Sequence, residues 1–234
     1  MSDFTSTIAA RLDGIRGRIA AAAVRSGRPP ESVRLVAVSK TYSSACVEAA
    51  VAAGQLDFGE NKVQEGLQKI TETTDNRIRW HVIGHLQSNK ARKAAEAFHW
   101  IHAVDSVSLL RKLDEGAAAA GRRPKALVQV DLAGEATKFG AAPAELPEIF
   151  AAAAECTAVE LVGLMLLPPA SDDPTEARPW FRKLMAVREG LLASGVPAAR
   201  LSELSMGMSH DFEVAIEEGA TIVRIGSAIF GERR

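Results

Sequence analysis

The sequence is poor in the features that would place a protein outside the cell or in a membrane. It has two cysteines in 234 residues, Cys46 and Cys156, far apart in alanine-rich surroundings. We therefore expect buried thiols and no disulfide. The first residues show no basic-then-apolar signal pattern, and no uncharged apolar stretch is long enough to span a bilayer. These absences predict a cytoplasmic protein in a reducing compartment.

The chain also lacks an excess of charge of either sign. Its 28 Lys and Arg residues nearly balance 29 Asp and Glu residues, for a net charge of -1. No overall field would attract nucleic acid or an anionic membrane. The basic clusters at 90–93 and 122–123 are short, as on solvated helix faces or ends. We predict neither nucleic acid nor membrane as a partner.

What the sequence does contain is a regular alternation of short apolar runs and amphipathic runs. Most of the apolar runs are apolar at consecutive positions, as in parallel strands covered on both faces. The eight predicted strands are Arg34–Ser39, Leu56–Phe58, Arg79–Ile83, Trp100–Val104, Ala126–Val130, Val159–Met165, Leu201–Leu204 and Thr221–Ile225. The predicted helices between them are Ser43–Ala53, Asn61–Ile70, Asn89–Phe98, Ser106–Ala120, Pro143–Ala154, Glu176–Ala193 and His210–Glu218.

Eight such units predict an α/β protein with a single (β/α)8 TIM barrel. A doubly wound open sheet has a similar pattern, but the first strand is not followed by the Gly-x-Gly-x-x-Gly turn of dinucleotide-binding folds. An apolar stripe at Ile8, Leu12, Ile15 and Ile19 predicts an extra N-terminal helix. We expect residues 1–30 to form this helix, packed on a single barrel of residues 31–234.

Lys40 is the most informative single residue, because it directly follows the first predicted strand. Active sites of such barrels lie at the C-terminal ends of the strands. Side chains two residues apart on a strand point to the same face. Lys40 therefore shares a face with Val36 and Val38, and its stem is expected to lie along the barrel interior. Apolar surroundings lower the pKa of a lysine and free its amine to attack a carbonyl. The alternative is an ordinary solvated lysine.

Two late loops have the composition of a phosphate site. The first is Leu204-Ser205-Met206-Gly207-Met208-Ser209, and the second is Gly226-Ser227 after the last strand. Barrels of this class frequently bind phosphate in the loops after strands seven and eight, and a helix start offers N–H groups to an anion. A lysine amine together with a phosphate site points to pyridoxal 5'-phosphate. Read alone, Ser209 could be a simple helix cap and Gly226 a turn residue.

Arg224 is an unusual residue for an apolar strand. A charge at this position must be paired or must reach the open end of the strand. Either it forms a structural ion pair, or it faces the pyridine nitrogen of the cofactor and keeps that nitrogen unprotonated. Other polar residues near strand ends are Glu60, Asn61, His85, Gln87, Asp105, Glu135 and Lys138.

Two other histidine patterns are weaker. His81 and His85 have the spacing of a metal pair on a helix, but His81 lies in a predicted strand and Gly84 interrupts the segment. We predict no metal site. His210 beside Asp211 could form a catalytic dyad, but an aspartate at a helix start is favoured by the helix dipole.

Motifs along nearly the whole chain resemble one known family. They include Val38-Ser39-Lys40-Thr41, Phe58-Gly59-Glu60-Asn61, Trp80 through Lys90, Gly163-Leu164-Met165, Leu204 through Ser209, and Val223-Arg224-Ile225-Gly226. This combination resembles the pyridoxal phosphate homeostasis proteins. The segments Asp131–Gly140 and Met165–Pro169 match less well, and the proline often found soon after the lysine is missing.

The resemblance implies a barrel like the N-terminal domain of alanine racemase, with pyridoxal 5'-phosphate held as a Schiff base on Lys40. It further implies that Arg224 faces the ring nitrogen and that Asn61 lies beside the ring. The phosphate would be held by Ser205, Met206, Gly207, Gly226 and Ser227. The family has no established catalytic reaction and is linked to vitamin B6 balance inside the cell. No catalytic residue is therefore assigned.

Three functions remain open from the residues. The first is a carrier or buffer of pyridoxal 5'-phosphate, monomeric and in transient contact with apoenzymes that need the cofactor. The second is an amino-acid racemase, which needs a proton donor and a proton acceptor on opposite faces of its substrate; the only tyrosine, Tyr42, lies two residues from the lysine, and no second domain is expected. The third is a Schiff-base aldolase acting on a sugar phosphate. Lys138 could be a second amine for the aldehyde or a solvated loop lysine.

Overall fold

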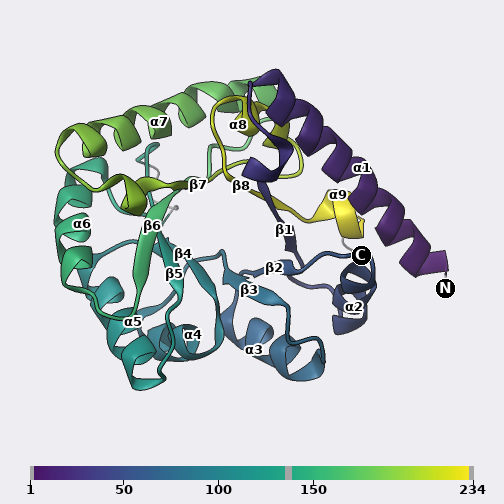
Figure 1. The fold of residues 1–234 in the computed structure, drawn as a ribbon, viewed down its shortest axis with the longest axis horizontal. Coiled ribbons are helices and arrows are strands. Elements are labelled where there is room, and N and C mark those ends of the chain that lie inside the picture. The colour runs from purple at the N-terminus through teal and green to yellow at the C-terminus, as the bar shows by residue number, and fades with distance from the viewer. Residues whose placement is uncertain (1–2, 135–138, 232–234) are drawn as a thin grey trace.

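The computed structural model describes residues 3–134 and 139–231. Within these residues, eight parallel strands pair in sequence order and close into a barrel, which confirms the predicted (β/α)8 fold. Figure 1 shows the strands at the centre and the helices around them. The strands are β1 (Arg34–Val38), β2 (Asp57–Glu60), β3 (Arg79–Val82), β4 (Trp100–Val104), β5 (Lys125–Gln129), β6 (Glu160–Met165), β7 (Glu203–Ser205) and β8 (Ile222–Ile225).

Helices follow the strands on the outside of the barrel. The α-helices are α1 (Asp3–Arg25), α2 (Ser44–Ala52), α3 (Val63–Glu72), α4 (Ala91–Ala97), α5 (Val107–Ala119), α6 (Leu146–Glu155), α7 (Arg178–Ala193), α8 (Phe212–Glu217) and α9 (Ser227–Phe230). Short 3-10 helices are η1 (Pro30–Ser32), η2 (Ser88–Lys90), η3 (Pro143–Glu145), η4 (Pro174–Ala177) and η5 (Ala198–Leu201). The sequence did not predict α9, because a single turn has too few residues to show periodicity.

Strand boundaries differ from the prediction where polar residues belong to the sheet. Strand β2 extends through Gly59 and Glu60 because both pair with β3, Gly59 opposite His81 and Glu60 opposite Val82. Strand β7 begins at Glu203, since Leu201 ends η5. Closure depends on β1 and β8, which pair from Arg34 opposite Ile222 to Ala37 opposite Ile225. The C-terminal ends of the first and last strands therefore lie side by side at one end of the barrel.

The barrel interior contains a small apolar cluster of Val36, Trp100, Leu127, Met165 and Ile222. The larger core lies between the strands and the surrounding helices. Side chains alternate between these two sides along each strand. Several inward positions are instead polar and fully buried, among them His81, His102 and Ser205. The interior is therefore a packed core with a polar component.

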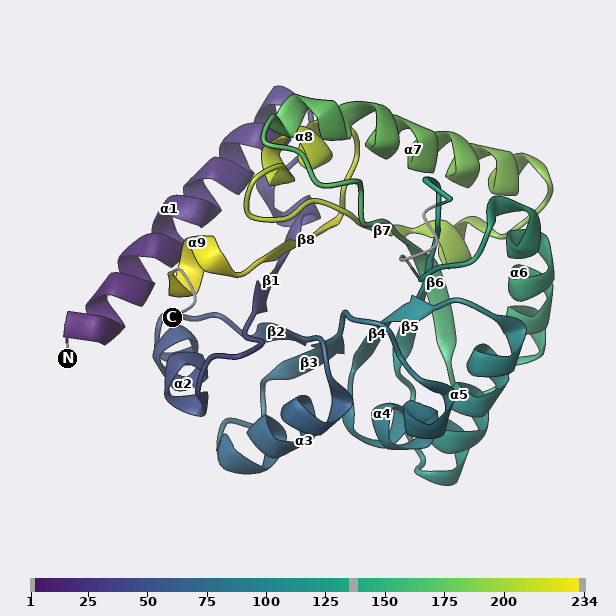
Figure 2. The ribbon, with the colours of Figure 1, turned by 180° about the vertical axis from the view of Figure 1, so that it is seen from behind.

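Helix α1 packs on the outside of the barrel against α8, α9 and α2; Figures 1 and 2 show it alongside α9 from opposite sides. Its stripe of Ile8, Leu12, Ile15 and Ile19 is buried, as the periodicity predicts. These side chains belong to the same core as the barrel helices. The division of the chain at residue 30 stays a prediction.

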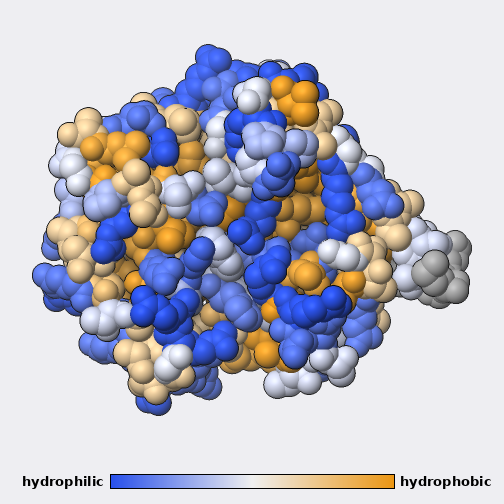
Figure 3. All heavy atoms as spheres, in the orientation of Figure 1, coloured by the Kyte–Doolittle hydropathy of each residue, from blue (hydrophilic) through white to orange (hydrophobic). Residues whose placement is uncertain are grey.

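Both cysteines are free thiols, as expected, but only Cys46 is buried; Cys156 is half-buried. Among the described residues, no helix is long and apolar enough to cross a membrane, and no cluster of side chains is suited to a metal ion. Figure 3 shows one face of the molecule, on which hydrophobic residues lie in separate patches among hydrophilic ones.

Candidate functional site

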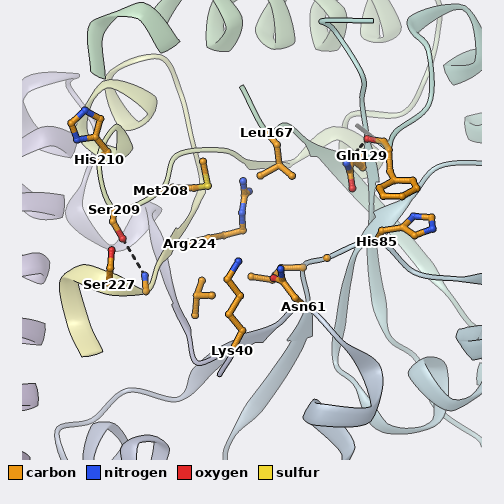
Figure 4. A pocket seen from close by; sticks show the side chains of 15 residues that line it. Lys40, Asn61, His85, Gln129, Leu167, Met208, Ser209, His210, Arg224 and Ser227 are labelled. Atoms are coloured by element: carbon orange, nitrogen blue, oxygen red, sulfur yellow. Dashed lines mark hydrogen bonds between the residues drawn. The ribbon is translucent and has the colours of Figure 1, made fainter. Parts of the chain in front are cut away.

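A cavity of about 520 Å³ opens among the C-terminal ends of the barrel strands. Figure 4 shows side chains from both halves of the sequence pointing into it. Its polar lining residues are Lys40, Asn61, His85, Gln129, Ser209, His210, Arg224 and Ser227. Apolar walls come from Val38, Ile83, Phe139, Leu167 and Met208. An apolar concave site with a few convergent polar groups is typical of cofactor binding.

Lys40 follows β1 and extends toward the centre of the cavity (Figure 4). The next residue, Thr41, has a φ of 69°, a left-handed conformation that is rare for a β-branched residue. Its backbone N–H donates to Oε1 of Glu65 at 2.5 Å. This contact stabilises the turn that aims Lys40 into the cavity.

A buried ionic cluster lies behind the same turn. Lys69 Nζ donates to the carbonyl of Ser39 at 2.6 Å and to Oε1 of Glu60 at 2.7 Å. The hydroxyl of Ser39 donates to the same Glu60 oxygen at 2.6 Å. Ser39, the residue before Lys40, is thus fixed through both its backbone and its side chain. Glu60 holds the lysine turn in place and does not line the cavity.

Arg224 approaches the cavity from β8, beside the strand that precedes Lys40. Its Nη2 donates to the carbonyl of Leu166 at 2.9 Å, and its Nη1 donates to Ser205 Oγ at 2.5 Å. Burial lowers the pKa of Arg224 to about 10. The guanidinium therefore remains charged at pH 7 and presents only donors to a ligand.

A group of small polar residues lies on another wall of the cavity. Ser209 and Ser227 point toward each other in Figure 4, and the backbone N–H of Gly226 donates to Ser209 Oγ at 3.2 Å. Helix α9 begins at Ser227. The N–H groups of Ile229 and Phe230 donate to the carbonyl of Gly226, so the N–H groups at this end that can face a ligand are those of Ser227 and Ala228. Two hydroxyls and these N–H groups can accommodate a phosphate.

Asn61 lies between Lys40 and the opposite wall, and a glycine fixes its position. A Cβ on Gly84 would lie 2.6 Å from the Asn61 carbonyl oxygen and 2.9 Å from its Cα. Only a residue without a side chain allows the loops after β2 and β3 to approach so closely. Asn61 therefore presents its amide to the cavity from a tightly packed backbone.

The wall opposite the serines carries an aromatic stack. The rings of His85 and Phe139 are stacked with centroids 3.6 Å apart and planes 12° apart. Gln129 of β5 donates from Nε2 to the carbonyl of Phe139. Phe139 is 53% exposed, so the stack lies at the edge of the cavity.

The structure brings five of the predicted cofactor residues into one cavity: Lys40, Asn61, Arg224, Gly226 and Ser227. It places the other three elsewhere. Ser205 is completely buried between His102 and Arg224, and Met206 is part of the core outside the barrel. Gly207, at a φ of 93°, packs so closely that a Cβ would lie 2.6 Å from that of Ala215.

The other polar residues named from the sequence also divide into those that line the cavity and those that do not. His85 lines the cavity, whereas Gln87 and Asp105 do not. The catalytic pair suggested by His210 and Asp211 does not form: His210 Nε2 donates to the carbonyl of Asp172 at 2.7 Å, and Asp211 accepts from the N–H of Met208 at 2.6 Å. Glu135 and Lys138 lie outside the described residues.

Sequence reasoning missed several residues of the site. Gln129, Phe139 and Leu167 lie near the segments where the motif match is weakest, so their roles had no signal in the sequence. Ser209 was noted as a loop hydroxyl, and the structure gives it the position in the cavity wall that we expected of Ser205. His81 and His102 could have been found as polar residues within otherwise apolar strands, which must have buried partners.

Comparisons with known proteins agree with this geometry. The family described as "Alanine racemase, N-terminal domain" matches residues 11–234. The chain is 44% identical to the pyridoxal phosphate homeostasis protein of Pseudomonas aeruginosa, covering 97% of this chain and 96% of that protein. It is 42% identical to the protein of the same name from Escherichia coli K12, covering 97% of each. The chain therefore belongs to the family of pyridoxal phosphate homeostasis proteins.

Solved structures of other proteins also match this chain. The structure of PipY from Synechococcus elongatus with pyridoxal 5'-phosphate bound is 42% identical, with a TM-score of 0.84 over 96% of this chain and 100% of that chain. A histidine racemase from Leuconostoc mesenteroides is 17% identical, with a TM-score of 0.71. The match covers 97% of this chain and 58% of that enzyme. The second likeness shows the shared fold alone.

Proposed function

We propose that this chain binds pyridoxal 5'-phosphate through Lys40 and acts as a carrier or buffer of that cofactor in vitamin B6 homeostasis. The observation that carries the proposal is the convergence of an amine, a guanidinium and a pair of hydroxyls on one cavity. The names of the relatives and the cofactor-bound PipY structure support it. When bound, the cofactor would supply an aldehyde for the lysine amine and an electron-withdrawing ring.

The residues present fit this cofactor. Ser209, Ser227 and the N–H groups at the start of α9 would hold the phosphate. Arg224 would face the ring nitrogen and, because it can only donate, would keep that nitrogen unprotonated. Asn61 would lie beside the ring, and Lys40 would provide the amine. This assignment replaces Ser205, whose hydroxyl is engaged below the cavity.

Tyr42 supports a carrier over a racemase. Racemisation needs proton-transfer groups on both faces of the substrate, and Tyr42 was the tyrosine available to supply one. Its hydroxyl donates to the carbonyl of Gly231 at 2.5 Å, and its ring packs against Phe230 with centroids 4.9 Å apart. The side chain is therefore engaged outside the cavity, where it stabilises the end of α9.

The proposal is tested by measuring transfer and turnover with one preparation. The protein is loaded with pyridoxal 5'-phosphate, freed of excess and mixed with a cofactor-free aminotransferase; we expect Lys40-dependent activation of that enzyme. In parallel, amino acids are incubated in deuterated water with the loaded protein. We expect no more deuterium at the α-carbon than with Lys40→Ala. Rapid incorporation that requires Lys40 would identify an enzyme and overturn the carrier proposal.

The recipient of the cofactor belongs to the same proposal. An open site on a single barrel suits exchange with other proteins better than it suits sequestered chemistry. We propose transient contact with apoenzymes that use pyridoxal 5'-phosphate. The monomeric state and the cytoplasmic location stay predictions.

A further inference from the structure

Five polar side chains form a continuous chain of hydrogen bonds through the barrel interior. It begins at Asp57 of β2 and ends at Arg224 in the cavity wall. Successive contacts are 3.0 Å from Asp57 Oδ1 to His81 Nε2, 3.0 Å from His81 Nδ1 to His102 Nε2, 2.9 Å from His102 Nδ1 to Ser205 Oγ, and 2.5 Å from Ser205 Oγ to Arg224 Nη1. Of these residues, only Arg224 lines the cavity.

The two ends of this chain carry opposite charges. Asp57 accepts two hydrogen bonds from Arg79, one of 2.8 Å from Nε and one of 2.6 Å from Nη2. Burial acts to raise the pKa of Asp57, but hydrogen bonds from Arg79 and His81 outweigh it and lower that pKa below its ordinary value. Asp57 is therefore an acceptor only, whereas Arg224 is a donor only.

Burial disfavours the charged form of the two histidines between these ends. Burial lowers the pKa of His81 and lowers that of His102 still further. His81 is stacked on Trp100, with ring centroids 5.5 Å apart and planes 5° apart. Both rings are completely enclosed by the barrel, and only one of the two facing nitrogens, His81 Nδ1 and His102 Nε2, can carry a proton. A neutral ring carries one proton and donates at only one nitrogen.

With both rings neutral, these constraints fix the position of every proton in the chain. Asp57 can only accept, so His81 donates from Nε2 and must accept at Nδ1. His102 then donates from Nε2 to His81 and accepts at Nδ1 from the Ser205 hydroxyl. The lone pairs of Ser205 are left for Arg224, which can only donate. All the hydrogen bonds therefore run in one direction, from Arg224 to Asp57.

We propose that Ser205, His102, His81 and Asp57 are positioning residues that hold the Arg224 guanidinium against the ring nitrogen of the bound cofactor. The carboxylate on β2 sets the direction of the chain, so that its charge influences the cofactor site through three intervening side chains. This inference rests on the proposed function, because it concerns the same cofactor. Apart from Arg224, these residues act without touching it.

The first test does not require the cofactor. The full chain, free of cofactor and labelled with ¹⁵N in its histidines, is examined by two-bond ¹H–¹⁵N correlation at pH 7.5, with signals assigned from single histidine variants. We expect His81 and His102 both to be neutral with the proton on Nε2. A proton on Nδ1 of either ring, or two protons on either ring, would overturn the ordered chain.

The second test concerns the cofactor site. Ser205→Ala removes the acceptor of Arg224, and Asp57→Asn removes the charge at the far end. For both variants we expect pyridoxal 5'-phosphate to bind about tenfold more weakly, the equivalent of about one hydrogen bond to a charged group. We also expect a shift in the absorbance maximum of the bound cofactor. The matched controls are Ser202→Ala, before β7, and Asp75→Asn, in an exposed pair with Arg77.

The outcomes separate this inference from the proposed function. Wild-type affinity and absorbance in both Ser205→Ala and Asp57→Asn would overturn the positioning role. If Ser205→Ala does not fold, Asp57→Asn alone decides the question. Failure of the wild-type protein to bind pyridoxal 5'-phosphate, with the histidine protons where we expect them, would overturn the proposed function while supporting the ordered chain.

Discussion

Glu60 and Lys69 form a buried ion pair, with 2.7 Å between Oε1 and Nζ, behind the turn that carries Lys40. The Glu60 side chain is completely buried, and that of Lys69 is only 6% exposed. Lys69 also contacts Glu65, whose carboxylate binds the N–H of Thr41. The position of Lys40 therefore depends on this cluster.

Replacing Lys69 tests this dependence. Lys69→Met leaves the buried Glu60 carboxylate without its cation, and we expect the free energy of unfolding to fall by about 3–5 kcal/mol. The exposed residue Lys62 provides the control variant Lys62→Met. Adding Glu60→Gln to Lys69→Met should recover part of the loss, because it removes the unpaired charge. A change below about 0.5 kcal/mol in denaturant unfolding would show that the pair contributes little.

Gly84→Ala tests the packing that fixes Asn61. The added Cβ would meet the Asn61 backbone at 2.6 Å, and overpacking of this kind costs about 1–3 kcal/mol. We expect lower stability and weaker binding of pyridoxal 5'-phosphate, because Asn61 is pushed toward the cavity. Gly17→Ala in α1 is the control, since nothing lies within 4 Å of its added Cβ. Unchanged affinity in Gly84→Ala would separate Asn61 from cofactor binding.

The buried histidines predict a dependence of stability on pH. Burial places the folded-state pKa of His81 and His102 below the ordinary value of 6.5. As pH falls through 6.5 the unfolded chain takes up protons that the folded protein does not, so stability is full above this pH and declines below it. The slope is at most about 1.4 kcal/mol per pH unit for each histidine.

Urea unfolding at pH 7.5 and pH 5.5 measures this effect. We expect wild-type protein to lose stability over this interval, and His102→Gln to lose less because one titrating group is gone. Ser202→Ala, which removes no titrating group, should keep the wild-type slope. Equal slopes for all three proteins would contradict the assignment of His102 as a buried neutral histidine.

The His85–Phe139 stack predicts control of cofactor release. Phe139→Ala removes an aromatic contact worth about 0.5–1.5 kcal/mol, so we expect release to a cofactor-free acceptor enzyme to accelerate by about two- to tenfold. Stopped-flow mixing with the acceptor enzyme gives the rate. Val24→Ala removes an exposed apolar side chain of α1 and should leave the rate unchanged. No acceleration in Phe139→Ala would mean that the stack does not limit release.

Much of the fold could be predicted from the sequence because consecutive apolar runs identify parallel strands. All eight runs correspond to strands of the closed barrel. The alternation that puts Lys40 on the same side as Val38 agrees with the cavity that both residues line. What the pattern could not give was the exact ends of strands such as β2, where Gly59 and Glu60 pair through backbone groups whatever their side chains.

The charged residues of the candidate site could be predicted from the sequence, but the choice between neighbouring serines and the contacts inside the barrel could not. Lys40 and Arg224 could be recognised because an amine and a guanidinium occur in or beside apolar strands. Ser205 and Ser209 could not be separated, since both are serines in one glycine-containing loop and only the backbone path decides which reaches the cavity. The histidine chain depends on contacts among β2, β3, β4 and β7, which only the closed barrel brings together.

The central claim is that Lys40 binds pyridoxal 5'-phosphate covalently. The most direct measurement incubates wild-type protein and Lys40→Ala with the cofactor, records absorbance, then reduces with borohydride and locates the modified residue by peptide mass spectrometry. We expect a visible band and a reduced adduct on the peptide containing Lys40, both missing from the variant. A wild-type protein without band or adduct, or with the adduct mainly on another lysine, would contradict the account.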